Sequence, residues 1–165
     1  MKKTRQLTLG AMIAAAYVVL TLLINSFGLA NGVIQVRVSE ALTILPYFTP
    51  AAIPGLFVGC IVANTLTGCA LWDIVLGSLA TLLGAVGTYL LRKYKWLAPL
   101  PPILANTIIV PFVLSYVYNF EGSIWYFMVT VGIGEVISCG IFGMILLLAL
   151  EKSVGSYNKR KNREN

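Results

Sequence analysis

Polar and charged side chains interrupt long apolar stretches of this chain, and they constrain its fold more than any other feature. A charged side chain at the centre of a bilayer costs about 2.5–3.5 kcal/mol even on lenient insertion scales. Such residues therefore usually face a cavity or a partner group and serve a function. The positions concerned are Arg37, Glu40, Asn64, Asp73, Glu121 and Glu135.

The composition places the chain among membrane proteins. It has 165 residues, of which 58% are hydrophobic and only 11% are charged, whereas soluble domains carry about 25% charged residues. The net charge of +6 gathers at the two ends and in one internal cluster, Arg92–Lys95. That distribution suits cytoplasmic membrane loops, and no basic face with interleaved aromatics indicates nucleic-acid binding.

Histidine is absent, and the three cysteines match no zinc pattern. We therefore expect no metal site and no cofactor, with Cys60 and Cys139 packed as reduced thiols in apolar segments. The basic start followed by an apolar run is too long for a signal peptide, and we interpret it as a retained first helix.

The sequence predicts an all-α integral membrane protein with six transmembrane helices. Residues 1–151 form one membrane domain, and residues 152–165 form a basic, frayed cytoplasmic tail. The expected helices cover residues 7–27, 35–48, 51–66, 71–91, 99–118 and 124–150.

The positive residues predict the orientation. With both termini in the cytoplasm, all three basic clusters lie on the cytoplasmic side only if an even number of spans separates them. The short, polar segment 35–48 is counted as a span for this reason. The polar residues then gather at the outer ends of the helices, which predicts a ligand pocket near the extracellular face.

Arg37 and Glu40 are three residues apart and share a face of a helix. One interpretation is an interfacial ion pair that anchors the second span. The other is a ligand-binding pair at the mouth of the pocket, where Gln35 adds further polar groups.

Glu135 is a stronger candidate for ligand binding than the pair Arg37 and Glu40. It lies deep in an apolar helix and shares a face with Gly132 and Cys139, so a flat ligand has room to approach the backbone. The alternative is an interhelical hydrogen bond to Asn106 or a serine. Asn106 precedes Pro111, which removes a backbone donor and can kink its helix.

Other candidates for ligand binding lie at the same expected end of the bundle. Asn64 ends one helix, Trp72 and Asp73 begin the next, and Trp125 begins the last. Tryptophan also favours the headgroup level without any ligand, so Trp72 and Asp73 are equally compatible with interface decoration.

Ala11 and Ala15 lie four residues apart on the first helix. Small residues at this spacing allow a second helix to approach closely. That helix belongs either to this chain or to a partner protein.

The chain contains no P-loop motif, so uphill transport would need energy from a partner. A membrane-embedded enzyme with Glu40 and Glu135 as an acid–base pair is an alternative, as is a structural membrane protein without a ligand. The enzyme is disfavoured because no nucleophile–base or metal-ligand constellation accompanies the two carboxylates.

Several segments together form a recognisable pattern: residues 35–46, 54–60 with Ala63 and Asn64, Asp73 with residues 77–81, Pro101 and Pro102 with Ala105 and Asn106, and residues 132–135. These segments resemble the QueT family, the substrate-binding S components of energy-coupling factor (ECF) transporters. The resemblance covers the chain from the first helix to about Leu150, and the block around Arg37 and Glu40 is its most specific part.

The resemblance implies a subunit of a bacterial plasma-membrane importer with no ATPase site of its own. Its partners would be a transmembrane coupling protein and two cytoplasmic ATPases, and its ligand a 7-deazaguanine precursor of queuosine. Ala11 and Ala15 match the pattern by which many S components meet the coupling protein. An S component for another vitamin or nucleobase is the alternative within transport.

Overall fold

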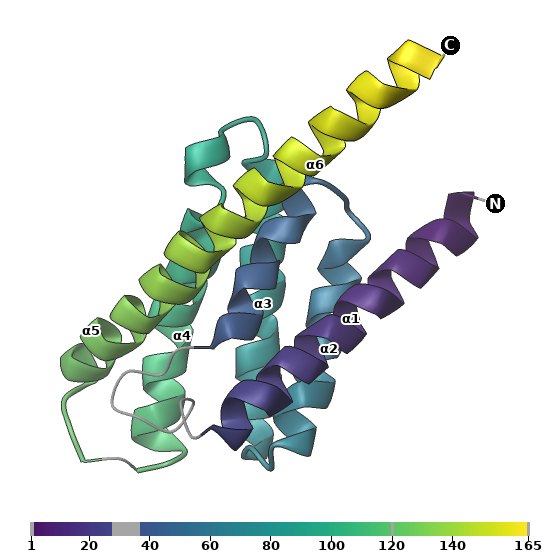
Figure 1. The fold of residues 1–165 in the computed structure, drawn as a ribbon. Coiled ribbons are helices and arrows are strands. Elements are labelled where there is room, and N and C mark those ends of the chain that lie inside the picture. The colour runs from purple at the N-terminus through teal and green to yellow at the C-terminus, as the bar shows by residue number, and fades with distance from the viewer. Residues whose placement is uncertain (1, 28–36, 120, 165) are drawn as a thin grey trace.

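The computed structural model describes residues 2–27, 37–119 and 121–164 (Figure 1). These residues form helices and connecting turns, without a β-strand among them. The elements are α1 (Lys2–Ser26), the 3-10 helix η1 (Val38–Tyr47), α2 (Ala52–Leu66), α3 (Leu71–Leu90), the short 3-10 helix η2 (Lys95–Leu97), α4 (Leu100–Tyr116), α5 (Ile124–Glu135), the π-helix η3 (Val136–Phe142) and α6 (Gly143–Glu164).

The helical content of the described residues confirms the all-α part of the prediction. Four described stretches are long and apolar enough to cross a membrane, and they cover Lys3–Ser26, Leu71–Leu90, Lys95–Tyr116 and Ile124–Ser153. The last of these combines α5, η3 and the first half of α6 into one long helical rod. The rod continues to Glu164, through the residues that we expected to be frayed.

The expected second and third spans are shorter than membrane-crossing helices. η1 has ten residues, which gives about 20 Å at the 3-10 rise, against about 30 Å for the hydrocarbon core of a bilayer. α2 has 15 residues and is also short. A topology with six full spans is therefore still a prediction.

η1 occupies the centre of the molecule. It packs against α1, α2, α3, η3 and α6, and Figure 1 shows it between α1 and the long rod. Of its residues, Ser39, Glu40, Ala41, Thr43, Ile44 and Pro46 are buried. A short, half-polar helix therefore sits where an apolar core would be expected.

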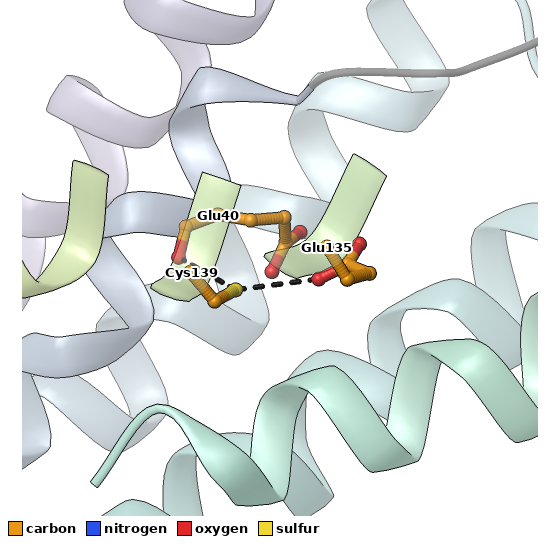
Figure 2. A group of neighbouring side chains, drawn as sticks. All are labelled: Glu40, Glu135 and Cys139. Atoms are coloured by element: carbon orange, nitrogen blue, oxygen red, sulfur yellow. Dashed lines mark hydrogen bonds between the residues drawn. The ribbon is translucent and has the colours of Figure 1, made fainter. Parts of the chain in front are cut away.

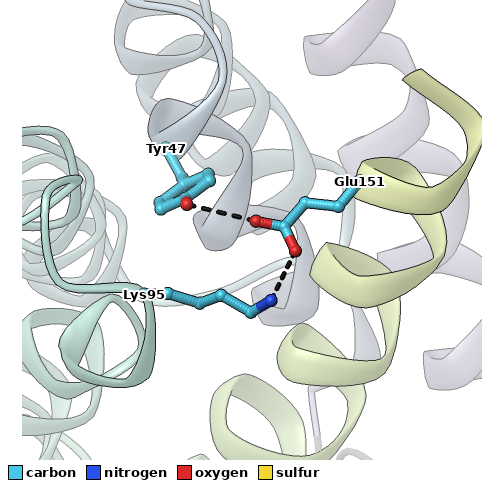
Figure 3. A network of polar contacts seen from close by, with 3 residues as sticks. All are labelled: Tyr47, Lys95 and Glu151. Carbon is cyan, nitrogen blue, oxygen red and sulfur yellow. Dashed lines mark hydrogen bonds and ion pairs between the residues drawn. The ribbon is translucent and has the colours of Figure 1, made fainter. Parts of the chain in front are cut away.

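Both chain termini point toward the same end of the bundle (Figure 1). The α3–α4 connection contacts α6 near this end, where Lys95 Nζ lies 2.5 Å from Glu151 Oε2. Tyr47, the last residue of η1, donates a hydrogen bond to Glu151 Oε1 at 3.2 Å (Figure 3). The connection that carries Arg92–Lys95 therefore lies beside the C-terminal half of the rod, as the charge pattern predicts.

Glycines allow α1 and α2 to cross in close contact. A Cβ atom on Gly55 would lie 2.5 Å from the carbonyl oxygen of Gly10, and one on Gly59 would lie 3.0 Å from Ala14 Cα. The side chains of Ile13 and Tyr17 are buried at the same crossing. This packing uses one face of α1.

We predict that Gly55→Ala destabilises the protein, because the added methyl group meets backbone atoms that have no room to move aside. Overpacking of this kind costs about 1–3 kcal/mol. A thermal melt of the purified protein in detergent measures the effect. Gly140→Ala is the control, since its added Cβ would meet its nearest atom at 3.7 Å. An unchanged melting temperature for Gly55→Ala would contradict the close crossing.

Candidate functional site

The two glutamates that the sequence singled out meet at the centre of the bundle. Glu40 comes from η1 and Glu135 from the end of α5, and they are 1% and 6% exposed. Figure 2 shows the two carboxyl groups facing each other with Cys139 beside them. One ligating atom from each of these three residues lies within 4.8 Å of the other two.

Cys139 links the two segments that carry the glutamates. Its sulfur lies 3.2 Å from Glu135 Oε2 and 3.4 Å from the backbone carbonyl oxygen of Glu40. The hydroxyl of Thr43 is 3.5 Å away. A thiol has one proton to donate, so Cys139 satisfies one of these acceptors at a time.

Tyr17 holds Glu40 in place from α1. The Tyr17 hydroxyl donates a hydrogen bond to Glu40 Oε1, and the ring is 1% exposed. One turn further along α1, Thr21 donates a hydrogen bond to Ser39 Oγ at 2.9 Å. These two contacts tie the start of η1 to α1.

The other carboxyl oxygen of Glu40 is buried and has no hydrogen-bond partner among the residues that the structure describes. The Asn106 amide and the Thr81 hydroxyl lie close to the Glu40 carboxyl, but neither meets hydrogen-bond geometry with Oε2. Asn106 also lies close to the Glu135 carboxyl. The side-chain amide of Asn106, on α4, therefore lies near both carboxyl groups. This position agrees with the interhelical contact between Asn106 and Glu135, which was one of two interpretations of the sequence.

The local backbone next to Glu135 is unusual. The rod changes from α-helix to π-helix over Val136–Phe142, immediately after Glu135, and Cys139 lies inside the π-helical segment. Short π-helical segments within α-helices frequently mark functional sites. The glycines at 132, 134, 140 and 143 weaken the helical preference here, although they do not specify a π-helix.

A second polar group lies where α2, α3 and the end of α4 meet. Asp73 Oδ2 accepts a hydrogen bond from the Tyr118 hydroxyl at 2.9 Å, and that hydroxyl accepts one from the Ala70 amide at 3.1 Å. Burial raises the pKa of Tyr118 to about 12. Its hydroxyl therefore stays protonated and acts as the hydrogen-bond donor to Asp73. A Cβ atom on Gly77 would contact both Asn64 Nδ2 and Asp73 Oδ1, at 3.3 and 3.4 Å, which places Asn64 beside this group.

Arg37 connects the two groups electrostatically. Its guanidinium interacts with the carboxylates of Asp73 and, more weakly, Glu40, yet it forms no ion pair within 4 Å among the described residues. The ion pair found there joins Lys95 to Glu151. Arg37 and Glu40 thus lie near each other without forming the close ion pair that one interpretation of their spacing expected.

The two tryptophans and the two alanines that the sequence singled out lie apart from this centre. Trp72 and Trp125 are 61% and 76% exposed, as tryptophans at a membrane interface would be, and their stacking on a ligand stays a prediction. Gln35 lies outside the described residues. Ala11 and Ala15 are exposed on α1, on the side away from its contact with α2.

Sequence reasoning did not single out Tyr17 or Thr81 as site residues, although Thr81 lies in one of the segments that carry the resemblance, and it expected Cys139 to be a packed thiol on the same helix face as Glu135. A tyrosine in the middle of an apolar helix is a usable signal, because a buried phenol usually finds a hydrogen-bond partner. The identity of that partner depends on tertiary packing and is not encoded locally.

The Glu40–Glu135–Cys139 cluster offers two oxygen ligands and one sulfur ligand to a cation. A structural zinc site uses four protein ligands, so the cluster is one short of that number. Its chemistry also suits hydrogen-bond donors of an organic molecule, because ionised carboxylates accept and never donate.

Most of the chain matches a known protein family. Residues 7–152 match the sequence model of a family described as QueT transporter. A curated relative, the "Queuosine precursor transporter QueT" of Lactococcus lactis subsp. cremoris, is 34% identical over 95 residues, which are 56% of this chain and 55% of that protein. The match thus spans about half the length of this relative. No solved structure matches the chain significantly.

We predict that Tyr17→Phe destabilises the protein, because it leaves both oxygens of a buried carboxyl group without a hydrogen-bond donor. Hydrogen bonds between membrane helices contribute about 1 kcal/mol, so the melting temperature of the purified protein should fall. Tyr126→Phe is the matched control, since Tyr126 is 50% exposed. Equal melting temperatures for the two variants would show that the contact with Glu40 contributes nothing to stability.

Proposed function

Because the chain belongs to the QueT transporter family, we propose that it is the substrate-binding S component of an ATP-driven ECF-type importer. Its ligand is a 7-deazaguanine precursor of queuosine that enters from outside the cell. The multi-pass membrane character follows from its apolar helices and its family. The name of the curated relative supports the class of ligand.

One observation carries this proposal: carboxyl groups from η1 and α5 meet in the interior, and one of their oxygens has no hydrogen-bond partner within the described part of the chain. A buried polar group without a partner is costly. A guanine-type ring presents an N–H beside an exocyclic amine, and a carboxylate is a natural acceptor for this edge. Asn106 lies near both carboxyl groups and can read the ring carbonyl.

The remaining proposed ligand-binding residues line the approach to this centre. Asn64 and Asp73 lie side by side at Gly77. The positive charge of Arg37 interacts with the carboxyl groups of both Asp73 and Glu40. Trp72 and Trp125 complete the set from the outer end of the bundle, and Gln35, which lies outside the described residues, is kept in it on the sequence alone. We place the termini and the Lys95–Glu151 contact on the cytoplasmic side, which puts this approach on the extracellular side.

We predict that the purified protein binds a tritiated 7-deazaguanine without ATP, and that Glu135→Ala and Glu40→Ala each weaken binding at least tenfold. That factor corresponds to about 1.4 kcal/mol, which is typical of losing one hydrogen bond to a charged group. Glu121→Ala is the control, because Glu121 is exposed. Full binding by both of the first two variants would remove this site from the proposal.

The partner interface is placed on α1. Ala11 and Ala15 are exposed, whereas Ile13 and Tyr17 on the other side of the helix are buried against α2. A coupling protein would dock on the small-residue face, where its helices can approach closely. Docking would connect this chain to the ATPases, whose hydrolysis of ATP would drive uptake.

We predict that Ala11→Trp and Ala15→Trp reduce uptake by cells that contain the coupling protein and ATPases, while ligand binding by the purified variants stays unchanged. The indole blocks close approach of the partner helix without touching the buried glutamates. Ala16→Trp is the matched control, since Ala16 is also exposed but lies about 100° around the helix from Ala15. Uptake at the wild-type rate in both variants would exclude this face as the interface.

A further inference from the structure

The 3-10 helix η1 presents two neighbouring rows of side chains to different parts of the molecule. A 3-10 helix has three residues per turn, so side chains three apart in the sequence lie in one row. Glu40 and Thr43 belong to the row at the proposed ligand site. Ala41, Ile44 and Tyr47 form the next row. A contact made by the second row therefore acts on the same helix that carries Glu40.

The second row of η1 packs along α6. Gly143, Leu147 and Glu151 are spaced four residues apart and share a face of α6. A Cβ atom on Gly143 would lie 3.6 Å from the carbonyl oxygen of Ala41, and Ile44 and Leu147 are buried in one cluster. The two elements thus stay in contact over about two turns of α6, and the contact ends at Glu151.

Three polar side chains close this end of the contact, and we call Tyr47, Lys95 and Glu151 the Glu151 network (Figure 3). The Tyr47 hydroxyl donates a hydrogen bond to Glu151 Oε1 at 3.2 Å, and Lys95 Nζ lies 2.5 Å from Glu151 Oε2. The side chains of the ion pair are only 30% and 31% exposed. One carboxylate therefore holds both the last residue of η1 and the α3–α4 connection.

η1 needs contacts at both ends because its own backbone gives it little stability. Hydrogen bonds in a 3-10 helix have poor geometry, and runs longer than three or four residues are uncommon, whereas η1 has ten residues and contains Pro46. At its start, Tyr17 and Thr21 hold it against α1. At its other end, the Glu151 network provides the polar contact.

We propose that Glu151 is a positioning residue for the ligand site: through Tyr47 it holds η1 at the place along the rod where Glu40 faces Glu135. This inference rests on the proposed function and names a determinant of ligand affinity that lies outside the site itself. The network is at the end of the bundle that we place in the cytoplasm. The affinity of a site that opens to the outside therefore depends on a contact at the opposite end of η1.

A charge exchange tests the positioning role, with binding of tritiated 7-deazaguanine to the full chain in lipid nanodiscs as the measurement. Glu151→Lys and Lys95→Glu each bring two like charges together and should each weaken binding by about threefold or more, in the range measured for partly exposed ion pairs. The double variant restores an ion pair, and the Tyr47 hydroxyl can accept a hydrogen bond from the ammonium group that replaces Glu151. Its affinity should return to within about twofold of the wild type.

Three further variants complete the set. Tyr47→Phe keeps the ion pair and removes only the link to η1, so it should also weaken binding. Glu121→Lys and Lys93→Glu are the matched controls, because both residues are exposed and make the same changes of charge. They should leave the affinity unchanged.

Hydrogen exchange of the η1 backbone amides provides a second measurement that needs no ligand. Exchange reports local opening of a helix, so η1 should exchange faster in Glu151→Lys and in Lys95→Glu than in the wild type. The double variant should exchange at the wild-type rate. The amides of α2 are the internal control and should not change, whereas a general loss of stability would affect both helices.

The outcomes separate this inference from the proposed function. If the wild type binds the probe and the single variants bind it equally well, the positioning role is overturned and the proposed function stands. Weaker binding that the double variant does not restore would also overturn it, because the ion pair would not be the cause. If the wild type does not bind the probe, the proposed function fails; unchanged exchange in η1 would then overturn the role of Glu151 as well, and faster exchange would support it.

Discussion

The contact between Tyr17 and Glu40 is the interaction on which the arrangement of the bundle depends. It satisfies one oxygen of a carboxyl group that is 1% exposed, in an interior where an unpaired polar group costs several kcal/mol. The contact fixes η1 against α1. In that position η1 also contacts α2, α3, η3 and α6. A short helix with polar residues therefore forms the centre of the fold, around which the other helices pack.

Small residues make room for this hub. Gly10 and Gly55 bring α1 and α2 together, and Gly84 on α3 lies against Pro102 at the start of α4. Close crossings let the outer helices pack around η1. They also use up one face of α1, which leaves Ala11 and Ala15 exposed on another. The internal packing and the free face of α1 are therefore two consequences of the same small-residue pattern.

Regular helices were predictable from the sequence, and irregular ones were not. The expected span at 71–91 corresponds to α3, Leu71–Leu90, and the prolines near residue 100 open α4 as expected. Apolar runs carry this information locally. The 3-10 form of η1 and the π-helix η3 depend on tertiary packing, because no residue pattern specifies which carbonyl an amide will reach. The nearness of Asn106 to the Glu135 carboxyl agrees with one of the two interpretations of Glu135, since intramembrane polar groups usually face one another, whereas Tyr17 gave no indication of its partner.

The same two elements are joined at two levels of the molecule. Near the centre, η1 and the long rod meet through Glu40, Cys139 and Glu135 (Figure 2). Near the end that carries the termini, they meet through Tyr47 and Glu151, with Lys95 from the α3–α4 connection (Figure 3). A transporter must bind its ligand and later release it, which requires two states with different affinities. Since the two carboxylates belong to different elements, any shift of η1 along the rod changes their separation and hence the affinity for a ligand between them.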